Sequence, residues 1–157
     1  MVRLVPMSKS DYQAFLESGI QRYAEEHVKA GNWHPSEALE KSRKEHQQLL
    51  PDGVATKNQY LFSIADEETG SKVGMIWFAV DDKRLQPSAF VYDFMIYEEF
   101  RRRGYGTQAM RTVEEKVREL GVTKISLHVF GHNHAARDLY EKIGYEITGI
   151  HMSKKVA

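Results

Sequence analysis

The sequence has no cysteine, no net charge and no long apolar stretch. Without cysteine, the chain forms no disulfide, offers no thiolate to a metal and uses no covalent cysteine intermediate. Lys+Arg and Asp+Glu both number 22, so no overall field favours nucleic acid or an anionic membrane. The apolar runs are only as long as a strand, and charges and a proline interrupt the amino-terminal residues, so neither a membrane span nor a signal peptide is expected. These absences predict a soluble cytoplasmic protein.

The remaining pattern is that of an α/β domain. At 157 residues the chain is long enough to bury its own core, and we expect one domain over residues 1–157. Hydrophobic periodicity predicts strands at residues 2–7, 59–82 (two strands around a Glu-Thr-Gly turn), 88–97, 121–130 and 145–156, the last stretch holding one or two. It predicts helices at residues 8–29, 36–50, 104–120 and 133–144. This order predicts a mixed sheet with one β-α-β crossover.

The stretch EEFRRRGYGTQAM, residues 98–110, places three arginines and two glycines between a buried strand and a helix. Glycine lets the backbone approach a ligand closely, and the free N–H groups and dipole of a helix's first turn favour an anion. We therefore weigh a phosphate or pyrophosphate site against a solvated surface turn. A dinucleotide fold is disfavoured, although GYGTQA fits G-x-G-x-x-A, because the next strand ends in HVFGHN without the carboxylate that would bind a ribose.

Two motifs resemble those of a known superfamily. Read from Arg101, RRRGYG fits R-x-x-G-x-G and resembles the acyl-CoA pyrophosphate loop of the GNAT acetyl-CoA-dependent N-acetyltransferases. The pattern N-x-x-A-x-x-L-Y-E-K-x-G-Y, from Asn133 to Tyr145, follows after a strand. The segments YAEEHVKAGNW, LLPDG, LHVFGHN and MSKK are similar to a bacterial subgroup of YycN type. The resemblance implies a GNAT fold, with a central mixed twisted sheet of six to seven strands flanked by about four helices.

The resemblance also implies acetyl-CoA as co-substrate and assigns residues to it. The pyrophosphate would lie against the turn and the first helical residues, namely Arg101, Arg102, Arg103, Gly104, Tyr105, Gly106 and Thr107. The strand end formed by Phe94, Met95 and Ile96 would pair with the pantetheine arm, and a backbone N–H near Ile96 would stabilise the oxyanion. Tyr140 would protonate the leaving thiolate and, like Asn133, contact CoA. From spacing alone, Tyr140 belongs to the core and Asn133 caps a helix.

The sequence leaves the general base open. Asp93 is the only charge in the apolar stretch AFVYDFMIY, so it is a base, a hook for the substrate ammonium or half of an ion pair with an arginine. Histidine is the residue type best suited to accept a proton near neutral pH, and His128 lies on the neighbouring strand, but a lone strand histidine is more often a bystander. By resemblance, Glu25, Glu26 and Trp33 line the acceptor pocket; an exposed helix face is the alternative for both glutamates. His132 and His134 have no third ligand in the sequence, so no metal is expected.

These observations predict an enzyme that transfers acetyl from acetyl-CoA directly to a primary amine of a small molecule or peptide. The alternative is an acyl-CoA-binding sensor or partner-binding module without catalysis. An RNA-binding domain would need a wider basic surface with aromatic platforms, so nucleic acid is not an expected partner. A membrane is not expected either, and a homodimer is compatible with the family. The identity of the amine does not follow from the sequence.

Overall fold

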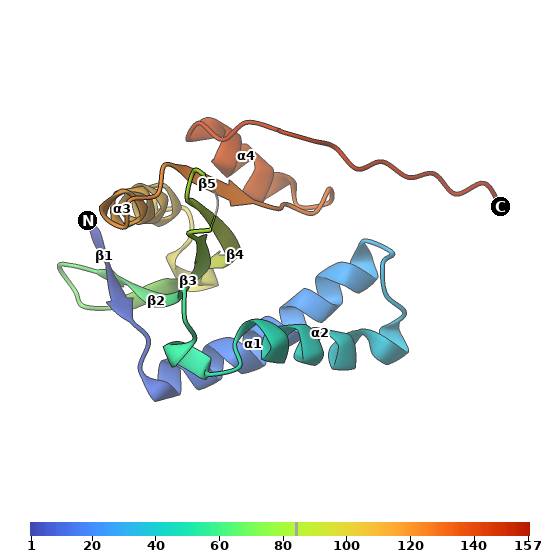
Figure 1. The fold of residues 1–157 in the computed structure, drawn as a ribbon, viewed down its shortest axis with the longest axis horizontal. Coiled ribbons are helices and arrows are strands. Elements are labelled where there is room, and N and C mark those ends of the chain that lie inside the picture. Colours follow the sequence, from blue (N-terminus) through green and yellow to red (C-terminus); the bar gives the residue numbers. More distant parts are fainter. Residues whose placement is uncertain (84) are drawn as a thin grey trace.

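The structure is a computed structural model that describes residues 1–83 and 85–157. One five-stranded sheet has the order β1-β2-β3-β4-β5, and its helices lie on both faces (Figure 1). The strands are β1 (Val2–Pro6), β2 (Gln59–Asp66), β3 (Lys72–Asp81), β4 (Ser88–Ile96) and β5 (Lys124–Leu127). The helices are α1 (Lys9–Lys29), α2 (Pro35–Leu49), α3 (Tyr105–Glu119) and α4 (His134–Lys142), with short 3-10 turns η1 (Gly53–Ala55) and η2 (Glu98–Phe100). The α/β architecture with a mixed sheet and four helices confirms the prediction.

The sheet separates two apolar clusters. Residues of β3 alternate between its faces: Ile76 and Phe78 pack in the cluster with α3, whereas Met75 and Trp77 pack in the cluster with α1. Burial on both faces explains why the sequence of β3 reads as a nearly continuous apolar run. Figure 1 shows α3 and α4 on one side of the sheet and the α1–α2 pair on the other.

Helix α1 begins where the sequence predicts. The Ser8 side chain accepts a hydrogen bond from the Asp11 backbone N–H at 3.1 Å, and the Asp11 carboxylate accepts from the Ser8 N–H at 3.4 Å. This reciprocal capping box satisfies two donors that the helix cannot satisfy internally. No helix formed by residues 1–83 or 85–157 combines the length and the apolar character needed to cross a membrane.

Strand β4 changes partners along its length. It pairs antiparallel with β3 from Ser88 to Ile96, with a register shift at Tyr92. It pairs parallel with β5 only from Ser88 to Val91. Beyond Val91 the edge of β4 that faces β5 therefore carries no neighbouring strand in the described part of the chain. Bulges of this kind are common beside active sites, where they redirect side chains and end the pairing of strands.

The carboxyl-terminal residues differ from the prediction. Residues 145–157 form no helix or strand, so the sheet has five strands rather than six to seven. The sequence YEITGIHMSKKV has the composition of a strand, but a strand also needs a neighbour to accept its hydrogen bonds. In the structure Tyr145 still packs against the main apolar cluster, but the residues from Glu146 onward have exposed side chains, and the end of the chain runs away from the sheet (Figure 1). The predicted strand at residues 121–130 is also shorter, because β5 ends at Leu127.

Candidate active site

The turn between β4 and α3 leaves backbone donors open. Gly104 caps α3 with φ of 80°, in the left-handed region, and no side chain caps this helix. The first hydrogen bond of the helix runs from the Gln108 N–H to the Gly104 carbonyl at 3.2 Å. The N–H groups that precede Gln108 in the first turn therefore point out of the amino-terminal end, where the helix dipole favours an anion. This geometry supports the phosphate interpretation of the turn.

The three arginines differ in what they contact. Arg101 donates from Nε to the Ile96 carbonyl at 2.9 Å, so its side chain holds the turn against the end of β4. The Arg103 guanidinium lies 5.8 Å from the centre of the Phe100 ring. Arg102 has a left-handed backbone, with φ of 66°. All three residues are exposed. Arg101 is thus bonded to the end of β4, whereas Arg103 lies beside Phe100 and the Tyr105 hydroxyl at the start of α3.

The two glycines of the motif also differ in role. Around Gly104 the space is open, with only the Gln108 side chain at 4.0 Å from a notional Cβ, so its positive φ is what requires glycine. At Gly106 a Cβ would lie 3.3 Å from Leu139, so the absence of a side chain lets α3 pack closely against α4. Between them, the Tyr105 hydroxyl donates to Asp66 Oδ2 at 2.6 Å and ties the start of α3 to the end of β2. Thr107 follows in the same first turn.

The end of β4 presents a free backbone edge beside this turn. Phe94 and Ile96 pack toward the cluster with α3, and Met95 packs toward the cluster with α1. The strand pairs with β3 on one edge, while the edge toward β5 is open beyond Val91. An extended amide chain can pair with such an edge as an added strand. The Ile96 carbonyl already accepts from Arg101, so it is the least available acceptor there.

Tyr140 lies on α4 beside the open edge. Its ring contacts Phe94 at 6.4 Å and Tyr145 at 5.5 Å between centroids. Burial, followed by the charges of Tyr145 and Asp93, raises the pKa of the Tyr140 hydroxyl, so this group is protonated at neutral pH. The Tyr140 hydroxyl makes no hydrogen bond to the described residues. Asn133, at the start of the same helix, accepts at Oδ1 from the Ala136 N–H at 3.2 Å and so caps α4. Tyr140 is therefore both packed and an available proton donor.

Asp93 forms a two-pronged ion pair with Arg22 of α1. Arg22 Nη1 donates to Oδ1 at 3.1 Å and Nη2 donates to Oδ2 at 3.0 Å. The side chains are 29% and 18% exposed, so the pair is shielded without being fully buried. Both carboxylate oxygens accept from a fixed cation. The geometry favours the ion-pair alternative for Asp93, because a base or ammonium hook would have to share these oxygens with Arg22.

A buried histidine near Asp93 was not singled out by the sequence. His46 of α2 has Nδ1 at 2.9 Å from the Ser42 carbonyl, which only accepts, so Nδ1 is the donor and Nε2 is the ring nitrogen left for another partner. A Cβ on Gly19 would lie 3.5 Å from Asp93 Oδ2 and 3.6 Å from His46 Nε2. Asp93 and His46 therefore meet the same face of α1 at Gly19. Only tertiary packing brings these two side chains together, so no motif marks them.

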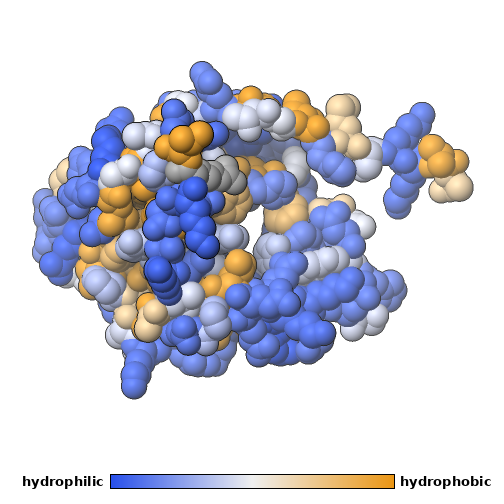
Figure 2. Space-filling view, viewed as in Figure 1, coloured by the Kyte–Doolittle hydropathy of each residue, from blue (hydrophilic) through white to orange (hydrophobic). Residues whose placement is uncertain are grey.

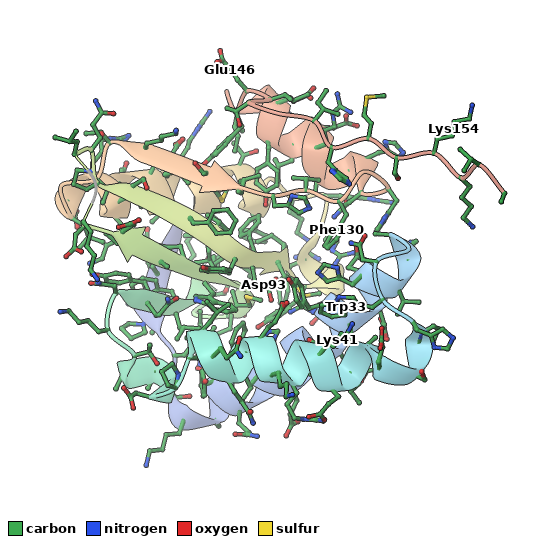
Figure 3. The ribbon with its side chains drawn as sticks, turned by 45° about the vertical axis from the view of Figure 1, so that its right-hand side comes forward. Trp33, Lys41, Asp93, Phe130, Glu146 and Lys154 are labelled. Atoms are coloured by element: carbon green, nitrogen blue, oxygen red, sulfur yellow. The ribbon has the colours of Figure 1, made fainter. Side chains whose placement is uncertain are left out.

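Aromatic rings line the end of the α1–α2 pair nearest to β5. The rings of His27 and Trp33 stack at 4.0 Å, and Phe130 meets His27 edge-on at 5.0 Å. Burial lowers the pKa of His27 below its ordinary value. Figure 3 shows Trp33, Phe130 and Asp93 on the same side of the molecule, and Figure 2 shows a hollow between this helix pair and the α4 layer. Aromatic faces beside a hollow suit an organic ligand, including a cationic one.

One hydrogen bond links the two sides of this hollow. His132, in the segment after β5, lies 2.5 Å from Glu26 Oε2 of α1. Glu25 is exposed and only accepts from Gln21, as on an ordinary helix surface. His128 contacts the Phe130 ring edge-on at 5.1 Å. Within residues 1–83 and 85–157 no three His, Asp or Glu side chains are grouped in the way that a metal ion would require.

The structure thus places the predicted residues on two sides of one opening. The turn, Asn133 and Tyr140 lie with α3 and α4, and Asp93, Glu26 and Trp33 lie with α1 and α2. The opening is the part of β4 that β5 leaves unpaired. A donor molecule on one side and an acceptor on the other would meet there.

The sequence and the fold are both similar to those of known proteins. Residues 20–145 match the model of the acetyltransferase (GNAT) family. Two Bacillus subtilis (strain 168) relatives, both named as uncharacterized N-acetyltransferases, are 39% identical (YycN, 99% of each chain) and 36% identical (YdgE, 98% of this chain and 97% of the relative). The crystal structure of Bacillus subtilis YycN superposes with a TM-score of 0.95 over 100% of this chain and 99% of that one, at 39% identity.

Proposed function

The chain belongs to the GNAT family of acetyltransferases, and from this membership we propose that it transfers acetyl from acetyl-CoA directly to a primary amine of a small molecule or peptide. The observation that carries the proposal is the open first turn of α3 beside the unpaired edge of β4. The turn offers backbone N–H groups to a pyrophosphate, with the exposed side chains of Arg102 and Arg103 as cations beside them. The β4 edge offers backbone partners to the amides of a pantetheine arm.

The residues around the opening each have a role that fits one step of the acetyl transfer. The β4 edge near Met95 and Ile96 donates to the thioester carbonyl oxygen, on which negative charge develops as the amine nitrogen attacks the carbonyl carbon. The new C–N bond forms as the C–S bond breaks, and the Tyr140 hydroxyl gives its proton to the departing thiolate. The raised pKa of Tyr140 keeps this proton in place at neutral pH. Asn133 contacts the same co-substrate from the start of α4.

The attacking amine must also lose a proton, and three side chains are candidates to accept it. Asp93 is held by Arg22 through both oxygens, so we assign it to positioning α1 against β4 rather than to proton transfer. His46 Nε2 faces Gly19 of α1, and His128 lies beyond β5 beside Phe130. We rank His46 first, because its tautomer is fixed by the Ser42 carbonyl and leaves Nε2 as the acceptor.

A thiol-release assay tests the proposal. Acetyl-CoA is mixed with the protein and with polyamines, amino acids, aminoglycosides and peptides with free amino termini, and free CoA thiol is measured. We expect thiol release that depends on one class of amine and a matching acetylated product by mass spectrometry. Tight acetyl-CoA binding without turnover on any amine would replace the enzyme by a sensor of acyl-CoA. No acetyl-CoA binding at all would overturn both functions.

A further inference from the structure

Five rings from three segments of the chain form a wall of the hollow between α1 and α4. They belong to Tyr23 and His27 of α1, Trp33 of the loop before α2, and Phe130 and His132 after β5. Tyr23 meets Trp33 edge-on at 5.6 Å between ring centres, and Phe130 stacks with His132 at 5.7 Å. All five side chains are partly exposed, so they border the hollow of Figure 2 rather than the core. We refer to these five residues as the aromatic wall.

One hydrogen bond joins the two halves of the aromatic wall. His132 donates from Nε2 to Glu26 Oε2 at 2.5 Å, across 106 positions of the sequence. Glu26 directly precedes His27, and Phe130 lies two positions before His132. The bond therefore fixes the segment that carries Phe130 against the helix that carries His27, whose rings meet edge-on at 5.0 Å. The two bonded side chains are 24% and 36% exposed, so the contact is partly shielded from water.

Charges near the aromatic wall discriminate between classes of amine. Burial lowers the pKa of His27, and the Glu45 and Glu26 carboxylates act in the opposite direction, so both lie near this ring. The Lys41 ammonium lies 6.0 Å from the centre of the Trp33 ring and forms an ion pair within α2. A ligand ammonium beside Trp33 would be repelled by Lys41, whereas an uncharged ring would not be. The wall therefore favours an amine with one charge and a flat, uncharged body over a polyamine.

The inner end of the aromatic wall leads to the proposed site of acetyl transfer. Tyr23 lies 5.8 Å from His46 between ring centres, and His46 is the residue that we rank first as acceptor of the amine proton. The Glu45 carboxylate lies beside the Tyr23 hydroxyl, whose pKa is raised by burial and then by this carboxylate. His46 in turn lies 5.7 Å from Trp77, which stacks with Tyr92 of β4 at 4.7 Å. Rings thus continue from the wall to β4, and a ligand body on the wall would carry its amine toward β4 on a short linker.

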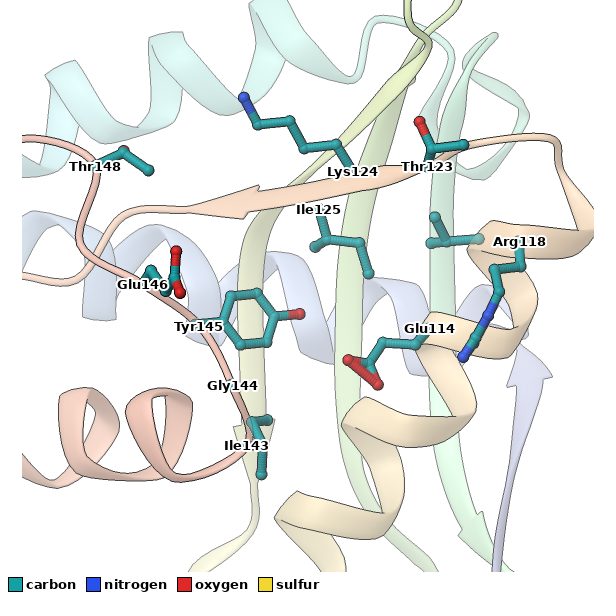
Figure 4. A pocket seen from close by; sticks show the side chains of 11 residues that line it. Glu114, Arg118, Thr123, Lys124, Ile125, Ile143, Gly144, Tyr145, Glu146 and Thr148 are labelled. Carbon is teal, nitrogen blue, oxygen red and sulfur yellow. The ribbon is translucent and has the colours of Figure 1, made fainter.

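A second hollow of the molecule does not combine these features. A cavity of about 400 Å³ lies between β5, α3 and residues 143–148 (Figure 4). Of the described residues that line it, only Tyr145 is aromatic, and Glu114 and Lys124 give it both signs of charge. It lies on the side of the sheet that carries α3, whereas His46 packs against α1 on the other side. The aromatic wall is therefore the surface that joins flat apolar faces to the site of acetyl transfer.

We propose that the aromatic wall binds the flat body of an aromatic amine, and that Glu26 and His132 are positioning residues that hold Phe130 as one side of this pocket. The proposal rests on the proposed acetyl transfer, because it assigns the acceptor of that reaction. The ring of the amine would pack on the wall, and its ammonium would lie toward Glu45 and His46. Loss of the Glu26–His132 bond would weaken the binding of the amine without changing the turn that binds acetyl-CoA.

Matched amines test the class of acceptor. Phenethylamine and 2-cyclohexylethylamine share the ammonium and the linker and differ in whether the ring is flat and aromatic, and spermidine represents the polyamines. We expect a kcat/KM for phenethylamine about 3–10-fold above that for the saturated amine, measured by thiol release. Calorimetry on the protein saturated with CoA should give the same order of affinities without turnover. Equal values for the two ring amines, or spermidine as the best substrate, would overturn the assignment.

Substitutions of the bonded pair test the positioning role. Glu26→Met removes the acceptor of the bond, and His132→Phe removes the donor but keeps a ring beside Phe130. Each should raise the KM of phenethylamine about 3–10-fold and leave kcat and the affinity for acetyl-CoA unchanged. The double variant should do no more than either one alone, and Glu26→Gln, which keeps an acceptor oxygen, should retain most of the parent affinity. Glu17→Met, on the exposed surface of the same helix, is the control and should change nothing.

The outcomes separate this proposal from the proposed acetyl transfer. Phenethylamine that binds to the CoA-loaded protein, binds more weakly to Glu26→Met and is never acetylated would support the pocket and overturn the transfer. Thiol release with an amine whose KM is the same in the parent, Glu26→Met and His132→Phe would support the transfer and overturn the pocket. Variants that lower kcat or the affinity for acetyl-CoA at an unchanged KM for the amine would also overturn it, because the bond would then act through α4.

Discussion

The two faces of the sheet differ in the groups that they offer to a ligand. On the side of α3 and α4 the recognition elements are backbone groups: an uncapped helix start at Gly104 and an unpaired strand edge after Val91. On the side of α1 and α2 they are side chains, and residues far apart in the sequence hold them in pairs, as Arg22 holds Asp93 and Glu26 holds His132. A backbone site suits a co-substrate shared by a whole family. A side-chain site can change from member to member and suits the acceptor.

The largest effect on the rate of acetyl transfer is expected from a substitution of Tyr140, which lies where the two sides of the opening meet. Tyr140→Phe removes one hydroxyl that makes no hydrogen bond to the described residues, so stability and acetyl-CoA affinity should remain close to those of the parent protein. If the hydroxyl protonates the thiolate, the single-turnover rate should fall by roughly 10²–10⁴-fold. Because the pKa of Tyr140 is raised, the parent enzyme should not lose this acid on the alkaline side up to about pH 10.

Tyr145→Phe is the matched control for this substitution. Its ring lies 5.5 Å from that of Tyr140, and burial raises its pKa to about 12, yet no catalytic step uses its hydroxyl. It should turn over as the parent does. Equal single-turnover rates in Tyr140→Phe and the parent would remove Tyr140 from the mechanism and leave it as a core residue.

The second prediction concerns the Arg22–Asp93 pair. Asp93→Asn leaves the shielded Arg22 without its carboxylate, so the free energy of unfolding should fall by about 1–3 kcal/mol. Arg22→Gln should cost a similar amount, and the double variant should cost less than the sum of the two. Chemical denaturation measures all three. Turnover per folded molecule should stay within a few-fold of the parent.

The opposite outcome would restore the other interpretations of Asp93. A stable Asp93→Asn variant that has lost turnover would make the carboxylate a base or an ammonium hook. In that case Arg22→Gln should keep the activity that Asp93→Asn loses. His46→Gln supplies the comparison, because it should lower the single-turnover rate if Nε2 accepts the amine proton.

The smallest effect is expected at the anchor of α3. The Tyr105 hydroxyl, followed by the Glu68 and Thr69 amides, lowers the pKa of Asp66. A lowered pKa means that the folded state holds the carboxylate better than the unfolded state does. The resulting stability is present above the ordinary pKa of aspartate and is lost as pH falls through the folded-state value. As the pH is lowered from 7 to 3, the melting temperature of Asp66→Asn should therefore fall less steeply than that of the parent protein. Identical slopes would contradict this role.

The difference between the two faces also explains what the sequence could predict. The site on the side of α3 and α4 could be predicted from local patterns. Glycine at a positive φ and an open helix start require a continuous motif, which runs from Arg101 to Thr107. Family membership, the α/β fold and four helices were predicted correctly on this basis. The same motif did not reveal that Gly106 serves packing against Leu139, because that contact comes from α4.

The site on the side of α1 and α2, where we propose that the acceptor amine binds, is built by contacts that no local sequence pattern encodes. Asp93 could be identified as a lone charge in an apolar strand, but its partner Arg22 is 71 residues away. His46 was missed for the same reason, since only the packing of α2 on α1 brings it to Gly19. The strand predicted at residues 145–156 was wrong for the single chain, because periodicity reports a preferred conformation and not the presence of a neighbouring strand.

The central claim is that the open start of α3 binds the pyrophosphate of acetyl-CoA, and two substitutions at one position test it. Asn and Asp both tolerate the left-handed backbone of Gly104 and have nearly the same shape, so they differ chiefly in charge. Calorimetry should show that Gly104→Asp binds acetyl-CoA at least about 10-fold more weakly than Gly104→Asn, which is about 1.4 kcal/mol of repulsion. Equal affinities in two folded variants would contradict the claim and place the co-substrate elsewhere.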